Sequence, residues 1–565
     1  MSARKLYDQA VDLHLHGQLH TAMDIYNRLL EQNPDDARVL FMQGNALAQL
    51  GQYDLARRSL EKAINLEPQH AEWLNNLGIV NHSSGRYSAA IDALNKAIEL
   101  DNQHLSSYLR LGIIYTERNE FDSAYTMLNQ AYALNNHNIT VLINLAILME
   151  KQDEIPGAIS YLERAFQIDD LHAETNLNLG NLYRQAGDYA SAEKHLDTVL
   201  GNYPKYRALA LTNYALIKGE QGLFGEALLL FENAINEDPA CHAARWNKGL
   251  TNLLLGRFVE GWELYDAGFL VGQRPHLGLP IPRWDGKSTD GKLLVWMEQG
   301  IGDEIMFASC LEDLAQHHPN FCVYCDQRLI ELFIRSFPQI DFESKEIAME
   351  HGVSAEYTAQ ICAGNLGQLY RKKRENFPKK GYLATHTQSQ RHWRQLLDQL
   401  PGKINIGISW RGGKHYAEKV KRSIPVETLV ETFKNKNVNL ISLQFNVSDE
   451  EKSVFQKNGI TLVELGDLDL RGNIEPVAAL ISNLDLVISV DNTNAHLAGA
   501  LGIPSWVLLP KIPDWRWLLN CDESHIYPNM SLFRQTTSGD WKAPLLRLEI
   551  LLNTRLNTPL LKLGP

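Results

Sequence analysis

The chain has little cysteine and no long apolar run. Its 565 residues include 6 cysteines, which argues against a disulfide framework. No apolar stretch approaches the ~18 residues that a membrane span needs. The amino terminus enters a helical pattern directly, without the apolar segment of a leader peptide. We therefore expect a cytoplasmic protein without a membrane span.

An excess of positive charge is also missing. The formal net charge is −13, and lysine and arginine are scattered through most of the sequence. Such a surface repels a polyanion unless a basic stripe interrupts it. Nucleic acid is therefore not an expected partner.

Two of the cysteines, Cys322 and Cys325, have the spacing of a metal or redox motif. The segment 321–325 has the composition of a strand, and a strand directs residues three apart to opposite faces. Core packing is therefore the expected role of both thiols. No resident metal or cofactor is expected anywhere in the chain.

The first half of the chain repeats one pattern at a period of about 34 residues. A small residue is followed by Gly-x-Tyr/Phe, then by Ala, a large apolar residue and Ala, and often by Pro. One copy reads Gly78, Gly85, Tyr87, Ala90, Leu94, Ala97. This pattern is typical of tetratricopeptide (TPR) repeats, helix pairs that bury their apolar stripes by stacking on their neighbours. We predict about seven and a half repeats over residues 1–265, forming an α superhelix with a concave groove.

Asparagine recurs at one phase of the repeat, two residues before the first small residue. On the first helix of a unit this position faces the groove, where a side-chain amide can pair with the backbone of an extended peptide. The alternative is that asparagine is merely tolerated on a solvated face, although its helix propensity is poor. Five of the six positions hold asparagine and one holds arginine; they are Asn76, Arg110, Asn144, Asn178, Asn213 and Asn247. This ladder is similar to that of the O-linked N-acetylglucosamine transferases, whose TPR groove holds protein substrates.

Beyond a Pro-rich joint at 266–290, the pattern changes to alternating strands and helices. A first lobe is predicted over 291–385. Its opening strand, at 293–296, leads into a turn with Gly300, Gly302 and Asp303. Glycines at such a turn let backbone approach a ligand, and the following helix start favours an anion. Asp303 could instead serve only as a helix cap.

A second lobe is predicted over 386–565, ending in a helix. Its first strand, at 404–410, is followed by a loop of cations and glycines, which can bind a diphosphate without metal. A solvated loop with random charge is the alternative. Two further strand ends should face the same cleft. The candidate residues are Trp410, Arg411, Lys414 and Arg422 in and after the first loop, Ser442 and Gln444 after the next strand, and Asp491, Thr493, Asn494 and His496 at 491–496.

The Asp-x-x-x-x-His-Leu-Ala segment from Asp491 to Ala498 resembles the heptosyltransferase-like glycosyltransferases. With the turn at 298–303 and the segment 513–517, the chain is similar to bacterial TPR–glycosyltransferase fusions. The resemblance implies a GT-B fold of two Rossmann-like lobes and a metal-independent inverting transfer from a nucleotide-sugar. It implies Asp303 as the base, with Glu304 as a rival, and phosphate or ribose contacts for His496. A packing role for His496 remains open.

The expected function is transfer of a sugar to Ser or Thr hydroxyls of a protein, and fusions of this kind suggest flagellin as a client. Two alternatives remain open: a lipid-linked or polysaccharide acceptor, and a TPR scaffold with an inactive transferase domain. The sequence does not identify the nucleotide base or the sugar of the donor. A homodimer is also left open, because TPR arrays often dimerise.

Overall fold

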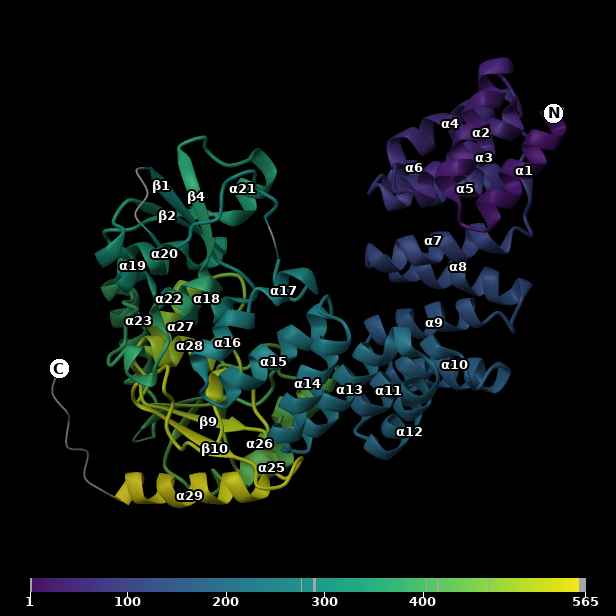
Figure 1. Ribbon diagram of the computed structural model, residues 1–565. Helices are drawn as coiled ribbons and strands as arrows, with labels where there is room; N and C mark the ends of the chain where they lie inside the picture. The colour runs from purple at the N-terminus through teal and green to yellow at the C-terminus, as the bar shows by residue number, and fades with distance from the viewer. Residues whose placement is uncertain are drawn as a thin grey trace. The chain divides into compact units, whose positions relative to one another are not determined.

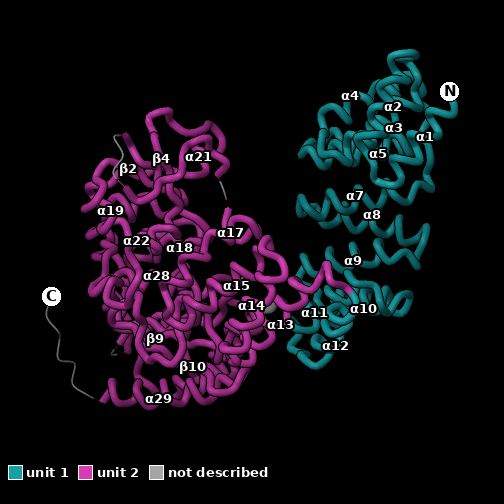
Figure 2. Tube along the Cα trace, viewed as in Figure 1, with its two compact units in different colours: residues 1–202 teal, residues 203–565 magenta. Residues whose placement is uncertain are grey.

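The computed structural model describes residues 3–275, 277–287, 291–402, 404–413, 416–466 and 468–557. The chain divides into two compact units, Met1–Asn202 and Tyr203–Pro565 (Figure 2). Among the described residues, no helix has both the length and the apolar character to span a membrane.

Antiparallel helix pairs make up the first unit and continue into the second (Figure 1). The first unit holds α1 (Ala3–Leu15), α2 (Leu19–Gln32), α3 (Ala37–Gln49), α4 (Tyr53–Leu66), α5 (Ala71–Ser83), α6 (Tyr87–Leu100), α7 (Leu105–Glu117), α8 (Phe121–Leu134), α9 (Ile139–Lys151), α10 (Ile155–Ile168), α11 (Ala173–Ala186) and α12 (Tyr189–Asn202). The second unit opens with η1 (Pro204–Tyr206), α13 (Arg207–Glu220), α14 (Phe224–Glu237), α15 (His242–Leu254), α16 (Phe258–Leu264) and α17 (Ala267–Leu270).

The recurring small residue of the repeat marks where the two helices of a pair cross. A Cβ on Gly78 would lie 2.6 Å from Cγ of Leu94, and the same contact relates Gly112 to Leu128 at 2.5 Å. Glycine on one helix therefore makes room for leucine on the other. Because this fit is local in sequence, it recurs at the repeat period and explains the pattern.

A four-stranded parallel sheet forms the first lobe of the α/β region, in the order β3-β2-β1-β4. Cys322 and Cys325 lie in β2 and belong to apolar clusters on opposite faces of the sheet, as predicted. The strands are β1 (Lys292–Trp296), β2 (Phe321–Cys325), β3 (Asp341–Ser344) and β4 (Tyr357–Cys362). The helices are α18 (Ile301–Ala308), α19 (Leu311–His317), η2 (Gln327–Leu329), α20 (Ile330–Ser336), α21 (Lys345–His351), α22 (Ala363–Tyr370) and η3 (Arg374–Asn376).

A six-stranded parallel sheet forms the second lobe, in the order β10-β9-β8-β5-β6-β7. Read from β7 and with β5 to β10 numbered 1 to 6, this is 3-2-1-4-5-6, the doubly wound order of Rossmann folds. The strands are β5 (Asn405–Ser409), β6 (Asn439–Ser442), β7 (Leu462–Val463), β8 (Leu486–Val490), β9 (Ser505–Leu509) and β10 (Met530–Arg534). The helices are α23 (Thr387–Leu397), α24 (Tyr416–Arg422), α25 (Val426–Glu431), α26 (Asp449–Lys457), α27 (Ile474–Ile481), α28 (Thr493–Ala500), η4 (Trp515–Trp517) and α29 (Lys542–Asn557). The predicted fold class, helical repeats followed by two parallel α/β lobes, is confirmed.

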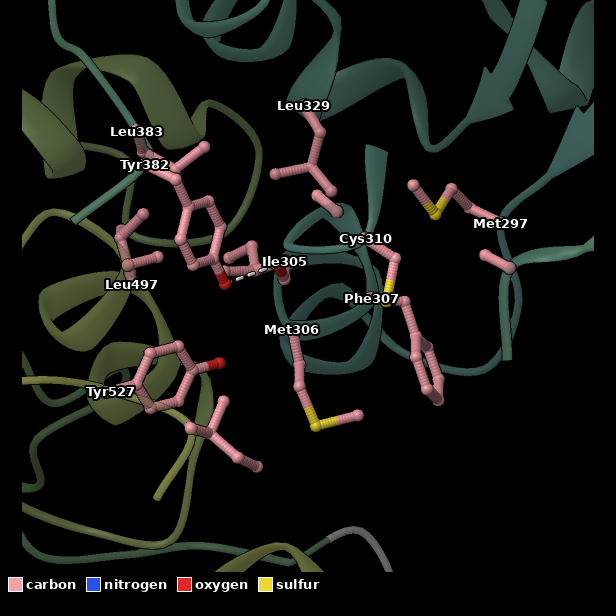
Figure 3. Packing of buried hydrophobic residues seen from close by; sticks show 14 of the residues in the cluster. Met297, Ile305, Met306, Phe307, Cys310, Leu329, Tyr382, Leu383, Leu497 and Tyr527 are labelled. Carbon is pink, nitrogen blue, oxygen red and sulfur yellow. Dashed lines mark hydrogen bonds between the residues drawn. The ribbon is translucent and has the colours of Figure 1, made fainter. Parts of the chain in front are cut away.

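The two lobes share one apolar core, which lies around α18. The Tyr382 hydroxyl donates to the carbonyl of Ile305 on α18 at 2.9 Å, and Leu497 of α28 and Tyr527 lie beside it (Figure 3). The Tyr382 amide donates to the carbonyl of Ala500 at 2.8 Å. The crossing segment between the lobes is therefore bonded to both of them.

The last repeat helices pack directly on the α/β lobes. Trp262 of α16 meets Trp515 edge-on with ring centroids 5.3 Å apart, and its indole N–H donates to the carbonyl of Arg371 at 3.0 Å. Tyr265 is buried in the same aromatic cluster. The end of the helical array is thus part of the second unit's core.

Candidate functional site

Charged side chains from both lobes meet at the carboxyl ends of the strands. Asp303 lies in the first turn of α18, after β1, and its carboxylate forms an ion pair with Arg516. Arg516 lies in η4, after β9, and its other nitrogen bonds Asp514 at 2.6 Å. Asp303 also accepts from the Gly300 amide at 3.1 Å, so it caps α18 and joins the lobes at the same time.

A second arginine completes this cluster. Arg422, at the end of α24, lies 3.2 Å from Asp491 and 3.9 Å from Asp514. Burial raises the pKa of Asp491 despite the neighbouring Arg422. Burial would also raise the pKa of Asp514, but Arg516 and Arg422 lower it below its ordinary value. We call Asp303, Arg422, Asp491, Asp514 and Arg516 the cleft cluster.

His496 lies behind this cluster, in the contact between α18 and α28. Its side chain is 7% exposed, and Nδ1 is 2.8 Å from the Tyr527 hydroxyl. A Cβ on Gly302 would approach Cδ2 of His496 to 2.8 Å, so this glycine makes room for the imidazole. Burial lowers the pKa of His496 to about 4. Its Nε2 atom also lies 4.0 Å from Asp491 of the cleft cluster, so His496 packs between the helices and borders the charged groups, and a ligand contact stays a prediction.

The strand order of the second lobe reverses between β5 and β8, where ligands of open α/β sheets bind. Ser409, the last residue of β5, and Ser489, the last but one of β8, have their hydroxyl oxygens 2.8 Å apart. Asn492 caps α28 and donates to Ser409 Oγ at 3.1 Å and to the carbonyl of Arg411 at 3.2 Å. A Cβ on Gly412 would lie 2.6 Å from the carbonyl oxygen of Asp491. These contacts hold the loops after β5 and β8 together as one surface, which adjoins Arg422.

Several predicted donor-binding residues hold this surface together. Gln444 accepts from the amides of Trp410 at 3.0 Å and Arg411 at 2.9 Å, and Asn494 donates to the carbonyl of Leu443 at 2.9 Å. Ser442 is buried and accepts from the Gln444 amide at 3.3 Å. These contacts give Gln444, Asn494 and Ser442 a role in loop geometry.

The remaining predicted donor residues are placed differently. Trp410 is fully buried, with its indole N–H 2.8 Å from Glu451, and the guanidinium of Arg411 bonds the carbonyl of Asn446 at 2.6 Å and lies 3.3 Å from Glu451. Thr493 is half-buried at the start of α28. Lys414 lies outside the described residues.

Glu304, the rival base, lies next to Asp303 but in another environment. It is fully buried, forms an ion pair with Lys345 and accepts from the Asp326 amide at 2.9 Å. Burial raises its pKa to about 7 against the opposing effect of Lys345. Its partners directly follow β2 and β3 in the first lobe, whereas Asp303 reaches the second lobe.

Arg274 is a residue that sequence reasoning missed. It is 1% exposed, and its guanidinium bonds the fully buried Glu298 carboxylate at 2.7–3.0 Å and the Asn365 side chain at 2.8 Å. It stacks on Phe269 with its carbon 3.9 Å from the ring centre. Because Glu298 begins the turn that leads to Asp303, the linker helps to position the candidate base. Nothing in the Pro-rich linker sequence signals this contact.

Arg516 was also missed, although its segment was noticed. An arginine between two tryptophans, directly after a strand and a short loop, was the available signal. The guanidinium carbon lies 4.7 Å from the ring centre of Trp515.

The six ladder positions all lie on the first helix of a pair and are half-buried. Asn76, on α5, donates to the Asn45 side chain at 3.1 Å. Both line a hollow of about 490 Å³ on α1, α3 and α5, together with His14 and Gln49. Asn144 and Asn247 instead donate to backbone carbonyls one turn earlier in their own helices. All six positions therefore lie at the same place in the repeat, and their binding of a peptide stays a prediction.

The helical region matches a known repeat family, and part of the chain is similar to a known bacterial protein. The tetratricopeptide repeat family matches residues 7–55, 41–104 and 212–268 in one form and 82–131 and 150–212 in another. Protein FlbA of Caulobacter vibrioides is 29% identical over 314 residues, which are 52% of this chain and 52% of that protein. The chain thus spans about half the length of the curated relative it matches.

Solved structures with similarity include the APC/C hetero-tetramer Cut9-Hcn1, with 22% identity, a TM-score of 0.37 and coverage of 43% of this chain and 48% of that chain. MamA has 24% identity, a TM-score of 0.27 and coverage of 28% and 94%. Human IFIT1 has 14% identity, a TM-score of 0.38 and coverage of 48% and 70%. The helical region of the chain consists of TPR repeats, which precede two parallel α/β lobes, and the chain has similarity to FlbA.

Proposed function

We propose that this chain is a glycosyltransferase that moves a sugar from a nucleotide-sugar to Ser or Thr hydroxyls of a protein. The observation that supports this proposal is the cleft cluster, in which Asp303 from one Rossmann-like lobe pairs with Arg516 from the other at the carboxyl edges of both sheets, next to Arg422. Ligands of such sheets bind at this edge.

The donor nucleotide fits the switch point of the second lobe. Gly412 keeps the loop after β5 close to the backbone after β8, and Arg422 stands beside both. A guanidinium and backbone N–H groups can bind a diphosphate without a metal ion. The contacts of Gln444 and Asn492 preorganise these loops, which lowers the cost of ordering them on binding.

Asp303 is the proposed base. The acceptor oxygen attacks the anomeric carbon while the bond from that carbon to the diphosphate oxygen breaks, and the diphosphate leaves with the electron pair. The hydroxyl proton passes to Asp303. Arginines beside the diphosphate stabilise the charge that develops on it. Attack opposite the leaving group inverts the anomeric centre. Glu304 is less suited to this role because Lys345 and the Asp326 amide enclose it.

The TPR helices are the proposed acceptor site. The ladder side chains are half-buried on the first helices, and amides at that position can bond an extended peptide without reading its sequence. Two of the six positions, Asn213 and Asn247, belong to the same compact unit as the lobes.

A donor screen tests the proposal first. The purified chain is mixed with uridine, guanosine, adenosine and cytidine sugar nucleotides, and nucleotide release is measured with and without candidate acceptors, flagellin first. Asp303→Asn keeps the shape of the side chain and should lower transfer at least ~100-fold. Replacing Asn144 and Asn178 with alanine together should raise the KM for protein and leave donor binding unchanged.

The alternatives give different results in the same screen. Transfer to a lipid-linked or polysaccharide acceptor but to no protein would replace the proposed acceptor class. No nucleotide release from any donor, together with no donor binding by calorimetry, would leave a TPR scaffold with an inactive transferase domain.

A further inference from the structure

Arg516 is held by two carboxylates that come from different lobes. Asp514 precedes it by two residues and accepts from its Nη1 atom and its backbone amide, at 2.6 and 3.1 Å. Asp303 belongs to α18 of the first lobe and meets the Nη2 atom. Arg516 is 12% exposed and Asp303 is 22% exposed. One end of the guanidinium is thus fixed within its own lobe, and the other end spans the cleft.

We propose that Arg516 binds the donor diphosphate, and that the diphosphate takes Arg516 from Asp303. This inference rests on the proposed function, because it assigns a step of donor binding at the same site. Arg516 is then a donor-binding residue, and Asp303 becomes available as a base only when the donor is present.

The pairing of both arginines within the cleft cluster favours exchange over simple addition. The cluster's three carboxylates, Asp303, Asp491 and Asp514, outnumber its two guanidiniums by one formal negative charge. A diphosphate added to this arrangement would meet neutralised arginines and unpaired carboxylate charge. Replacing the Asp303 oxygen on Nη2 of Arg516 with a phosphate oxygen keeps the guanidinium paired, because Asp514 continues to hold Nη1.

Asp303 is the carboxylate that can leave. Asp491 is 4% exposed and lies in the same lobe as its partner Arg422, and Asp514 lies in the same lobe as Arg516, two residues before it. Asp303 comes from the opposite lobe and meets Arg516 through a single oxygen, so a turn of its side chain breaks this ion pair without disturbing the others. It retains its bond to the Gly300 amide at 3.1 Å, which keeps it in place beside the cleft.

Trp515 and Asp514 hold the guanidinium of Arg516 in a fixed orientation. Trp515 lies under the guanidinium at 4.7 Å and Asp514 fixes the Nη1 side, so the Nη2 side keeps its direction when Asp303 departs. A planar fork held in this way suits a phosphate, and a lysine would not reproduce it. The exchange also predicts an order: the donor binds before the acceptor is deprotonated.

The test measures binding of nucleoside diphosphates by calorimetry, without turnover. The titrated probes are UDP, GDP, ADP and CDP, and the full-length proteins are the wild type, Asp303→Asn, Arg516→Ala, Arg516→Lys and the double variant Asp303→Asn/Arg516→Ala. Asp303→Asn should tighten binding ~10-fold because the competitor for Arg516 loses its charge, and Arg516→Ala should weaken it at least ~10-fold. Asp522→Asn, which alters a carboxylate that is 73% exposed and pairs with Arg547, controls for net charge and should have no effect.

The double variant separates exchange from general electrostatics. If Asp303 competes for Arg516, removing its charge should give no gain once Arg516 is alanine. If Asp303→Asn raised the affinity for the diphosphate by an equal ~10-fold with Arg516 present and with Arg516→Ala, the proposed exchange would be wrong. If Arg516→Ala is poorly folded by circular dichroism, Arg516→Lys takes its place, with weakened binding expected and unchanged binding contradicting the role of Arg516. If the wild type binds a diphosphate and Asp303→Asn gains nothing, the exchange fails and the proposed function stands. If no protein binds any of the probes, both fail together.

Discussion

At the scale of single residues, the buried imidazole of His496 makes the lobe contact sensitive to acid. Its pKa falls from 6.5 to about 4 in the folded chain because burial disfavours the imidazolium. Between these pH values the unfolded chain binds the proton and the folded chain does not, so stability falls as the pH is lowered from 6.5 to 4. The loss attributable to His496 should reach about 3 kcal/mol.

Urea unfolding of the wild type and His496→Gln at several pH values checks this prediction. The difference in unfolding free energy between the two proteins should change with pH over that window and level off above it. His16→Gln, in which the replaced side chain is 70% exposed, serves as the control and should follow the wild type. Parallel curves for all three proteins would contradict the burial argument.

Gly302 gives a second prediction at the residue scale. Gly302→Ala should cost about 1–3 kcal/mol, because the new Cβ would press on His496 at 2.8 Å and force α18 away from α28. The matched control is Gly219→Ala on α13, where nothing lies within 4 Å of the new Cβ. That change should stabilise the chain by about 0.5–1 kcal/mol through helix propensity. Thermal unfolding measures both, and equal shifts would show that α18 and α28 are not tightly packed there.

At the scale of elements, the linker is tied to the turn between β1 and α18. Arg274→Met leaves the Glu298 carboxylate buried without its cation and should cost about 3–5 kcal/mol. Arg283→Met removes a pair with Asp266 in which the arginine is 51% exposed, and should cost no more than about 1 kcal/mol. Chemical denaturation compares the two. A small cost for Arg274→Met would mean that the buried pair contributes little to this joint.

The elements also show what a sequence can reveal. The repeats were predictable because the Gly78–Leu94 fit and its copies are local and periodic. The strands at 293–296, 321–325 and 404–410 were predictable from their apolar runs, whereas β3 (Asp341–Ser344) has one large apolar residue and gave no such signal. The order of elements indicated the two lobes. The cleft cluster was predictable only in part: Asp303, Arg422 and Asp491 follow strands, but Arg516 lies 213 residues from Asp303, and no local pattern records that pairing. The Arg274–Glu298 bond was hidden for the same reason.

At the scale of the whole molecule, the last repeat helices belong to the core of the α/β lobes. A fragment of residues 203–565 should therefore unfold cooperatively, because it keeps Trp246, Trp262 and Tyr265. A fragment of residues 266–565, cut where the repeat pattern ends, loses these three side chains and exposes Trp515. It should bind a hydrophobic dye and lose its cooperative transition. Equal melting of the two fragments would contradict this account of the core.

The central claim is that this molecule transfers a sugar to a protein and that Asp303 takes the acceptor's proton. The most direct measurement is the intact mass of candidate acceptor proteins, flagellin first, isolated from cells that carry the wild-type chain, Asp303→Asn or the control Asp522→Asn. The account predicts a glycan mass on at least one acceptor with the wild type and the control, and its loss with Asp303→Asn while that variant remains folded. An unchanged mass on every candidate in all three strains would contradict it.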